Sequence, residues 1–333
     1  MSRTALLNCA GPLATLCILT VSGPAVGETY VTFNVNNNAT SVTAINSGGA
    51  LTGYDCDDVS CSGFVRAADG TITSFDPTGS TLTYPFDINR KGSITGYFCE
   101  SSDPCSAQGF VRKPEGKISI FSAPSGYTDI EPAAMNDSGV LTGSDADNAG
   151  RRHGFLRSSD GTITTFDPAG SFGTNPTAIN GSGDIAGYYE DSVRKVHGFL
   201  RTADGTITSF DCRKPAFTWA FGISGKDAVA GNCGDDAATN GFERTPGGKI
   251  KTFAVQGSTA TYPHGMNAKG AITGEYSDSG RAIHGFVGSP KSGFMSFDVP
   301  GGSRTDPSSI NDGGDIAGSY TSSGSVNGFV RMP

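Results

Sequence analysis

Hydrophobic and polar positions follow one pattern that recurs about every 44 residues along the chain. In one unit, β-branched and aromatic residues gather in four short segments, at 177–180, 184–188, 197–201 and 206–211. Gly, Asn, Asp and Ser separate these segments, and an Asn-x-x-Gly turn joins the first two. Short apolar segments bounded by such turn residues indicate β-strands in tight hairpins. Each unit therefore predicts four antiparallel strands.

Two markers show how often the unit recurs. The hairpin asparagine returns at intervals of 43, 47, 44, 44, 43 and 44 residues, with Ser224 in its place once: Asn46, Asn89, Asn136, Asn180, Asn267 and Asn311. The third segment carries Gly-Phe each time, at Phe64, Phe110, Phe155, Phe199, Phe242, Phe286 and Phe329. Four strands in about 44 residues match the size of a propeller blade. We therefore predict an all-β fold, a seven-bladed β-propeller with four antiparallel strands per blade.

The two ends of the repeat array favour a closed ring over a linear solenoid of the same period. The last repeat stops at Pro333 without a fourth strand, whereas residues 29–34 resemble the fourth segment of the other units. We expect this N-terminal strand to complete the last blade and close the ring, which removes an exposed sheet edge. A solenoid would need atypical end repeats, and none is evident. Residues 28–333 are thus expected to form a single propeller domain.

Composition agrees with many short strands. The chain has 48 Gly and 17 Pro, but its 36% hydrophobic residues supply enough apolar surface for a core. Only 17% of residues are charged, which argues against a long solvated helix or a coiled coil. The net charge of −8, without a basic stretch, argues against a nucleic-acid partner or an anionic membrane surface.

Residues 1–27 have the pattern of a signal peptide. Arg3 gives a positive start, residues 5–21 are mostly apolar, and Ala25 and Gly27 form a small-x-small cleavage site. No later segment reaches the length of a membrane span, and a lipid anchor is the weaker alternative. We expect cleavage near Gly27 and a secreted or periplasmic monomer without a membrane span.

Six cysteines follow the signal segment, and an even number in an exported chain suggests disulfides. In three units, one cysteine follows the second strand and another lies in a loop on the same face of the ring. The predicted pairs are Cys56–Cys61, Cys99–Cys105 and Cys212–Cys233.

A histidine precedes the Gly-Phe pair in three units, at His153, His197 and His284. Together with the nearby Asn-x-x-Gly hairpin, the repeat resembles that of the bacterial HAF-repeat family, extracellular proteins named for a His-Ala-Phe signature. The resemblance covers nearly all of residues 29–333, although glycine replaces the alanine throughout. It implies export and a repeat fold, and it implies no particular activity.

The repeated polar residues are expected to be architectural, because a catalyst is not needed in every blade. We expect the repeated arginines and aspartates to form ion pairs between blades or to constrain turns: Arg66, Arg112, Arg157, Arg201, Arg244, Arg331, Asp76, Asp167, Asp211 and Asp298. The three histidines occupy equivalent positions in different blades and should lie apart, whereas zinc ligands all lie about 2.1 Å from one metal. We predict no metal site.

Function is expected where the repeat varies, on the first strands that line the central channel. Five residues before the hairpin position, the units carry Ser41, Tyr84, Glu131, Asn175, Trp219, Tyr262 and Asp306. Three residues before it, they carry Thr43, Phe86, Ala133, Thr177, Phe221, His264 and Ser308. These residues should form a ring at the channel mouth on the face with the disulfides, and neither position carries an arginine or lysine.

Such a ring suits ligand binding. Aromatic residues can stack on sugar faces, and carboxylates, amides or a histidine can bind hydroxyls; the predicted set is Tyr84, Glu131, Asn175, Trp219, Tyr262, His264 and Asp306. We therefore expect an exported binding or scaffold protein for an extracellular glycan or small molecule. A ring that merely plugs the channel mouth is the structural alternative.

A carbohydrate-active enzyme using the same face is the functional alternative, less favoured than binding. Glu131 and Asp306 are candidates for the carboxyl pair of a glycoside hydrolase, which lies about 5 Å or about 6.5–9.5 Å apart according to mechanism. His264 and Tyr262 are candidates for the base and acid of a polysaccharide lyase. Neither a serine elbow nor a cysteine nucleophile is evident.

No cofactor is expected, and calcium is the one option left open. Residues 145–150 begin like a calcium loop, but Ala149 replaces an oxygen ligand and no glutamate closes the loop.

Overall fold

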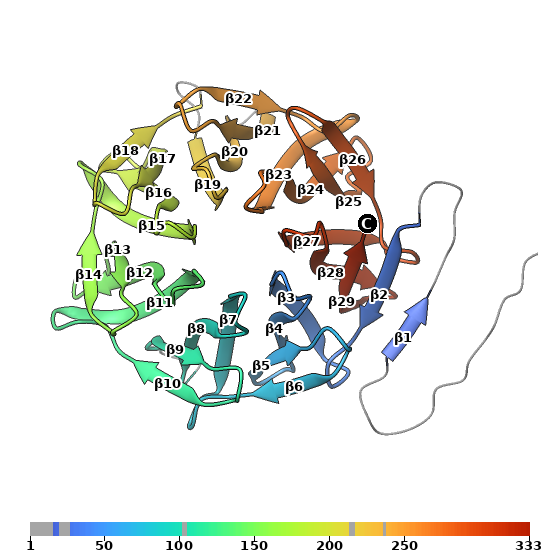
Figure 1. Ribbon diagram of the computed structural model, residues 1–333, viewed down its shortest axis with the longest axis horizontal. Helices are drawn as coiled ribbons and strands as arrows, with labels where there is room; N and C mark the ends of the chain where they lie inside the picture. Colours follow the sequence, from blue (N-terminus) through green and yellow to red (C-terminus); the bar gives the residue numbers. More distant parts are fainter. Residues whose placement is uncertain (1–15, 20–26, 102–104, 213–216, 236–237) are drawn as a thin grey trace, which may run out of the picture.

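The structure, a computed structural model, describes residues 16–19, 27–101, 105–212, 217–235 and 238–333 (Figure 1). In these ranges every regular element is a β-strand, which confirms the predicted all-β fold. No helix of the described residues is long and apolar enough to cross a membrane. Consecutive strands pair antiparallel in groups of four, as each repeat predicts, and one parallel pairing joins the first group to the second and the fifth to the sixth.

The first two groups comprise β3 (Ala39–Ile45), β4 (Leu51–Cys56), β5 (Cys61–Arg66) and β6 (Ile72–Phe75), then β7 (Leu82–Ile88), β8 (Ile94–Cys99), β9 (Gln108–Arg112) and β10 (Ile118–Phe121). The third and fourth comprise β11 (Tyr127–Met135), β12 (Leu141–Asp147), β13 (Arg152–Arg157) and β14 (Ile163–Phe166), then β15 (Ser171–Ile179), β16 (Ile185–Asp191), β17 (Val196–Arg201) and β18 (Ile207–Phe210). The fifth and sixth comprise β19 (Phe217–Ile223), β20 (Val229–Asp235), β21 (Ala238–Arg244) and β22 (Ile250–Phe253), then β23 (Ser258–Met266), β24 (Ile272–Asp278), β25 (Ile283–Ser289) and β26 (Gly293–Phe297).

The last group joins the two ends of the repeat array. It comprises β27 (Arg304–Ile310), β28 (Ile316–Ser322), β29 (Ser325–Met332) and β2 (Thr29–Phe33). β2 pairs antiparallel with β29, so the N-terminal strand completes the last repeat as predicted. On its other side β2 pairs with β1 (Leu16–Leu19). The rest of the predicted signal segment, apart from Gly27, lies outside the described residues.

The groups surround a central axis, and the first strand of each lies nearest to it (Figure 1). β3 begins at Ala39, opposite Cys56 of β4, and ends next to the hairpin of Asn46. The starts of the first strands therefore share one face of the ring with the turns between second and third strands. We call this the disulfide face, and the opposite one, with the asparagine hairpins, the hairpin face.

The six hairpin asparagines each link their group to the next, whereas the fifth group, with Ser224, is linked by the backbone N–H of Gly225 to the carbonyl oxygen of Ala268. Asn89 donates from Nδ2 to the carbonyl oxygen of Asn136 at 3.2 Å, and its Oδ1 accepts from the backbone N–H of Ser93 at 3.0 Å. Asn311 donates in the same way to the carbonyl oxygen of Asn46, which joins the last group to the first. Equivalent bonds to the next hairpin carbonyl start from Asn46, Asn136, Asn180 and Asn267.

The Gly-Phe pairs form the core between neighbouring groups. Phe199 is fully buried and meets Phe166 of the preceding group edge-on, with ring centroids 6.1 Å apart. Phe166 in turn covers Gly154 of its own group, where a Cβ atom would collide with the ring. Glycine is therefore needed beneath the fourth-strand aromatic residue, and phenylalanine beside it fills the interface.

The repeated arginines pack at these interfaces as well, and the expectation of ion pairs between blades is wrong. The guanidinium of Arg201 lies over the ring of Phe166, 4.9 Å from its centroid, because the aromatic face attracts a cation. Arg201 also donates to the carbonyl oxygen of Thr202 at 3.3 Å, which fulfils the expected constraint on a turn. Equivalent cation–π contacts are made by Arg66, Arg112, Arg157, Arg244 and Arg331.

All three predicted disulfides are present, Cys56–Cys61, Cys99–Cys105 and Cys212–Cys233. Each closes loops on the disulfide face. Disulfides of this kind indicate an oxidising environment, such as the cell exterior or the periplasm.

Candidate functional site

The first strands aim one set of predicted side chains into the channel. In every first strand the pairing register skips the residue three positions before the hairpin position, which forms a β-bulge. A bulge re-aims its side chain. The bulge residues line a channel cavity of about 200 Å³: Thr43, Phe86, Ala133, Thr177, Phe221, His264 and Ser308.

Tyr84 belongs to an aromatic cluster on the first and second groups. Its ring lies 5.0 Å from that of Tyr54, edge-on, and 5.3 Å from that of Tyr97. Phe86 stacks on Tyr97 at 5.6 Å. Burial, and then the negative charge of Glu131, raise the pKa of Tyr97 to about 12. We call Tyr54, Tyr84, Phe86 and Tyr97 the first aromatic cluster.

Trp219 belongs to a second aromatic cluster, on the fourth and fifth groups. Its ring centroid lies 4.5 Å from that of Phe217 and 6.4 Å from that of Tyr188. Phe221, a bulge residue, meets Tyr188 edge-on at 6.1 Å. Asn175 lies opposite Tyr188 in the register of β15 and β16. We call Tyr188, Phe217, Trp219 and Phe221 the second aromatic cluster.

A charged pair lies between the two clusters. Glu131 accepts two hydrogen bonds from the guanidinium of Arg152, at 2.7 and 2.8 Å, and Arg152 also donates to Ser144 Oγ at 2.7 Å. Two parallel bonds of this length make a strong, fixed pair. The positive charge of Arg152 opposes the rise in the pKa of both Tyr97 and Tyr188, so it lies near both clusters.

Asp306 belongs to a second charged cluster, formed by β24, the second strand of the sixth group, and β27, the first strand of the seventh. Arg304 donates from Nε to both carboxylate oxygens of Asp306 at 2.7 Å, and from a terminal nitrogen to Glu275 at 3.3 Å. Glu275 lies opposite Tyr262 in the register of β23 and β24, and its side chain is 15% exposed. Burial, and then the neighbouring Asp306 carboxylate, raise the pKa of Glu275 to about 8, so its carboxyl group carries a proton at neutral pH.

His264 is a neutral base inside the channel. Its Nδ1 lies 2.9 Å from the carbonyl oxygen of Pro307, so Nδ1 carries the proton and Nε2 has a free lone pair. Burial lowers the pKa of His264 below its usual range, although the Pro307 carbonyl and Asp306 oppose this. The imidazole is therefore uncharged at neutral pH.

The four catalytic candidates fall into two clusters. Asp306 lies with Glu275 and Arg304 and influences the pKa of His264, and Tyr262 pairs in register with Glu275. Glu131 lies apart from these residues in its pair with Arg152. Arg152 and Arg304 do not occupy either of the two varying first-strand positions, five and three residues before the hairpin position. Their positive charges nevertheless pair with the carboxylates of Glu131 and Asp306.

Glu275 is the functional candidate that sequence reasoning misses on this face. It occupies the second strand, at the position paired with the varying residue of the first. An alignment of the repeats could have identified Glu275, because this second-strand position also varies. Its residues are Tyr54, Tyr97, Ser144, Tyr188, Asn232, Glu275 and Ser319.

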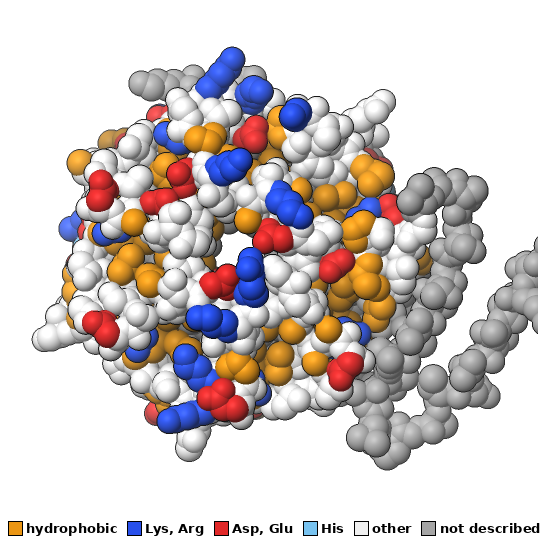
Figure 2. Space-filling model, in the orientation of Figure 1, with side chains coloured by type: hydrophobic (Ala, Val, Ile, Leu, Met, Phe, Trp, Pro, Cys, Tyr) orange, Lys and Arg blue, Asp and Glu red, His pale blue; other side chains and the backbone are white. Residues whose placement is uncertain are grey.

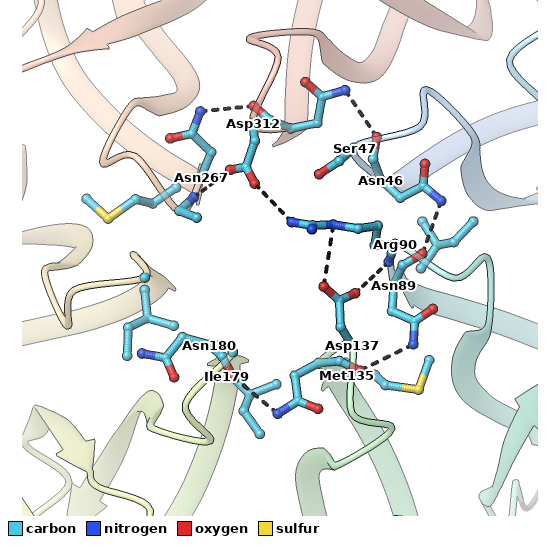
Figure 3. A pocket seen from close by; sticks show the side chains of 18 of the residues that line it. Asn46, Ser47, Asn89, Arg90, Met135, Asp137, Ile179, Asn180, Asn267 and Asp312 are labelled. Carbon is cyan, nitrogen blue, oxygen red and sulfur yellow. Dashed lines mark hydrogen bonds and ion pairs between the residues drawn. The ribbon is translucent and has the colours of Figure 1, made fainter.

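A larger cavity, of about 360 Å³, opens at the centre of the hairpin face (Figures 2 and 3). The residues just before and just after each hairpin position line it, and we call it the hairpin cavity. Six of the seven hairpins share the sequence Asn-x-x-Gly. The residue just after the hairpin position nevertheless varies: Ser47, Arg90, Asp137, Gly181, Gly225, Ala268 and Asp312.

The three repeated histidines are held within their own groups. His197 lies between Asp211, 2.8 Å from Nδ1, and Asp191, 3.3 Å from Nε2. His153 and His284 have the same surroundings. In the calcium-like segment, Asp147 accepts two backbone hydrogen bonds and closes a turn. Among the described residues, no group of three or more His, Cys, Asp and Glu side chains is placed to hold a metal ion.

The sequence matches no protein-family model and none of the curated proteins. Solved structures do resemble the chain. Virginiamycin B lyase from Staphylococcus aureus aligns over 92% of this chain and 99% of its own, with a TM-score of 0.60 and 15% identity. The β-propeller domain of the Trilobed protease from Pyrococcus furiosus aligns over 88% of this chain and 98% of its own, with a TM-score of 0.59 and 11% identity.

The fold is that of a β-propeller. Puromycin hydrolase adds a similarity over 86% of this chain and 50% of its own, with a TM-score of 0.62 and 13% identity. At such identities the likeness concerns the fold alone, and function has to be argued from the side chains.

Proposed function

We propose that the chain is an exported seven-bladed β-propeller that binds a glycan or small molecule at the channel mouth on the disulfide face. The strands β2 to β29 make 28 strands, and pairing in fours gives seven blades. The three disulfides and the predicted signal segment support export.

The observation that carries this proposal is the placement of two aromatic clusters on either side of the Glu131–Arg152 pair. Tyr84 and Trp219 belong to different clusters, and each offers a ring as a stacking surface for a sugar. The charged pair supplies both acceptors and donors for hydroxyl groups. A ligand spanning this arc of the ring would contact apolar faces at both ends and hydrogen-bonding groups in the middle.

The test is a glycan array screened with the full-length secreted protein, followed by titration of the best glycan. Trp219→Ala and Tyr84→Ala are expected to weaken binding by about tenfold each, as the loss of a stacking contact requires. Met295→Ala, an exposed side chain on the outer strand β26, serves as the control and should bind normally. If both aromatic variants bind the glycan as tightly as the natural chain, the glycan site does not lie at the channel mouth on the disulfide face.

A carbohydrate-active enzyme is the second candidate, and the Glu275–Asp306–Arg304 cluster favours it. A carboxyl group with a pKa raised to about 8, beside a second carboxyl group held by an arginine, is the arrangement of a general acid with its charge partner. His264, neutral at the same side of the ring, offers a base. A panel of polysaccharides would be assayed for new reducing ends and for unsaturated products, with Glu275→Gln as the inactive variant. Binding without either product contradicts the enzyme and leaves the binding proposal intact.

We further propose that the chain belongs to the HAF-repeat family and is exported, to the cell exterior or the periplasm, as a monomer cleaved near Gly27. The repeated histidine before Gly-Phe, together with the nearby Asn-x-x-Gly hairpin, supports the family. Mass spectrometry of the exported protein should give an N-terminus at Glu28, and light scattering should give the mass of one chain. An uncleaved N-terminus or a dimeric mass contradicts this part of the proposal.

A further inference from the structure

The hairpin cavity has an apolar floor around the channel axis. The residue just before each hairpin position is Ile or Met in every repeat: Ile45, Ile88, Met135, Ile179, Ile223, Met266 and Ile310. Concave apolar surfaces of about 300–1,000 Å³ are the usual size of small-molecule sites. At about 360 Å³, the cavity has room for a short aliphatic chain.

The rim of the cavity is charged on one side and bare on the other. Arg90, Asp137 and Asp312 project from the second, third and last of the seven hairpins (Figure 3). The consecutive rim positions 181, 225 and 268 are Gly, Gly and Ala. A ligand can therefore enter over the bare side and reach the charged groups from within the cavity.

The two carboxylates are fixed in place by the backbone. Asp137 accepts from the N–H of Arg90 at 2.8 Å, and Asp312 accepts from the N–H of Ala268 at 3.0 Å. Each uses Oδ1 for this bond, so Oδ2 is left to face the cavity mouth. Lys269 donates to the carbonyl oxygen of Asp312 at 2.6 Å and not to its carboxylate.

The guanidinium of Arg90 fills the space between these two Oδ2 atoms (Figure 3). It lies 3.6 Å from that of Asp137 and 3.7 Å from that of Asp312, longer than the roughly 2.8 Å of a charge-assisted hydrogen bond. Its side chain is 66% exposed. Loose, exposed ion pairs contribute little, so another cation could replace this guanidinium at low cost.

We propose that the hairpin cavity binds an organic cation, a primary amine on an aliphatic chain, whose ammonium group displaces Arg90 from between Asp137 and Asp312. Among the described lining residues, Arg90 is the one cation and faces two carboxylates, whereas Lys269 lies outside the lining on the backbone carbonyl of Asp312. The lining itself is therefore negative, which favours a cation over an anion. The aliphatic chain would pack on the ring of Ile and Met side chains. This site lies on the opposite face from the proposed glycan site and does not depend on it.

Isothermal titration of the full-length secreted protein with hexylamine and with hexanoate tests the proposal, because the two probes share a chain and differ in charge. Hexylamine is expected to bind and hexanoate is not. Asp137→Asn and Asp312→Asn should each weaken hexylamine binding by about tenfold, the effect of losing one charge-assisted contact. Arg90→Ala should tighten it several-fold, because a competing cation is removed.

Asp69→Asn, an equal charge change in an exposed turn, is the matched control and should leave hexylamine binding unchanged. Trp219→Ala should leave it unchanged too, so the failure of this site and of the glycan site can be told apart. No heat with hexylamine up to about 10 mM overturns the proposal, because weaker binding would have no specificity. A preference for hexanoate, or loss of binding in Arg90→Ala, overturns it equally, since either result would make Arg90 the ligand-binding group.

Discussion

Replacing Asn267 by serine and by alanine separates the two kinds of hydrogen bond that each hairpin asparagine makes. Asn267 is 6% exposed. Its Nδ2 donates across the blade interface to the carbonyl oxygen of Asn311 at 2.9 Å. Its Oδ1 accepts from the N–H groups of Lys269 and Ala271, at 3.1 and 2.9 Å, within its own hairpin. The natural Ser224 shows what serine can keep, since its Oγ accepts from two N–H groups of the same hairpin.

Asn267→Ser should therefore lose only the bond between blades, and Asn267→Ala should lose all three. At about 1 kcal/mol for each buried hydrogen bond, the expected losses in the free energy of unfolding are about 1 and about 3 kcal/mol. For a domain of about 300 residues, each kcal/mol lowers the thermal midpoint by about 2 °C. Urea unfolding followed by circular dichroism measures the free energies, and calorimetry measures the midpoints.

Asn148→Ser, in a turn on the disulfide face, is the control for the substitution itself and should leave both quantities unchanged. Equal losses for Asn267→Ser and Asn267→Ala would show that the hairpin bonds contribute nothing. Losses below about 0.5 kcal/mol for both would refute the idea that the asparagines hold neighbouring blades together.

Arg157→Met should lower the free energy of unfolding, measured by urea titration, by about 1 kcal/mol, because the guanidinium of Arg157 lies 4.6 Å from the ring centroid of Phe121. An unchanged free energy of unfolding would show that this cation–π contact does not stabilise the fold. Reduction of the three disulfides should lower the midpoint of thermal unfolding. Loop-closure entropy predicts a loss of about 2 kcal/mol for each of the two short loops and about 3 kcal/mol for the loop closed by Cys212–Cys233. An equal midpoint with and without reductant would show that the disulfides do not stabilise the fold. The pKa of Glu275 is about 8 in the folded state and lies near 4.5 in the unfolded state, so the folded state binds the Glu275 proton more tightly and the free energy of unfolding of the natural chain falls as pH rises from about 4.5 to about 8. Glu275→Gln lacks this proton and should therefore become more stable than the natural chain over the same pH range. Parallel pH profiles of the free energy of unfolding would refute the buried, protonated carboxyl group.

The sequence allows the strands, their grouping and the disulfides to be predicted because these follow from spacing along one chain. Asn180 and Phe199 recur at a fixed period, so each repeat predicts the same hairpin and the same core contact. The position of Arg201 recurs too, but its partner Phe166 belongs to the preceding blade. Only the three-dimensional stacking of blades decides whether such an arginine meets a carboxylate or an aromatic ring.

The candidate site is less predictable because side chains converge from different strands. Asp306 varies on a first strand and can be found by aligning repeats, whereas its neighbour Glu275 comes from the second strand of the blade before. Arg152 reaches Glu131 from a third strand. At the hairpin cavity, Arg90 reads as an ordinary turn residue until the ring brings Asp312, from the other end of the repeat array, within 3.7 Å.

The pairing of β2 with β29 sets the order in which this molecule can mature. Thr29 lies opposite Met332, so the two strands are separated by about 300 residues of chain. The other blades consist of consecutive strands and can form as soon as their own sequence is available. The last blade must wait, because β2 is synthesised before the other blades but can pair only after β29 has been made. Ring closure is therefore expected to be the slow step in folding, and a chain interrupted before residue 332 would carry complete blades that cannot yet lock into a ring.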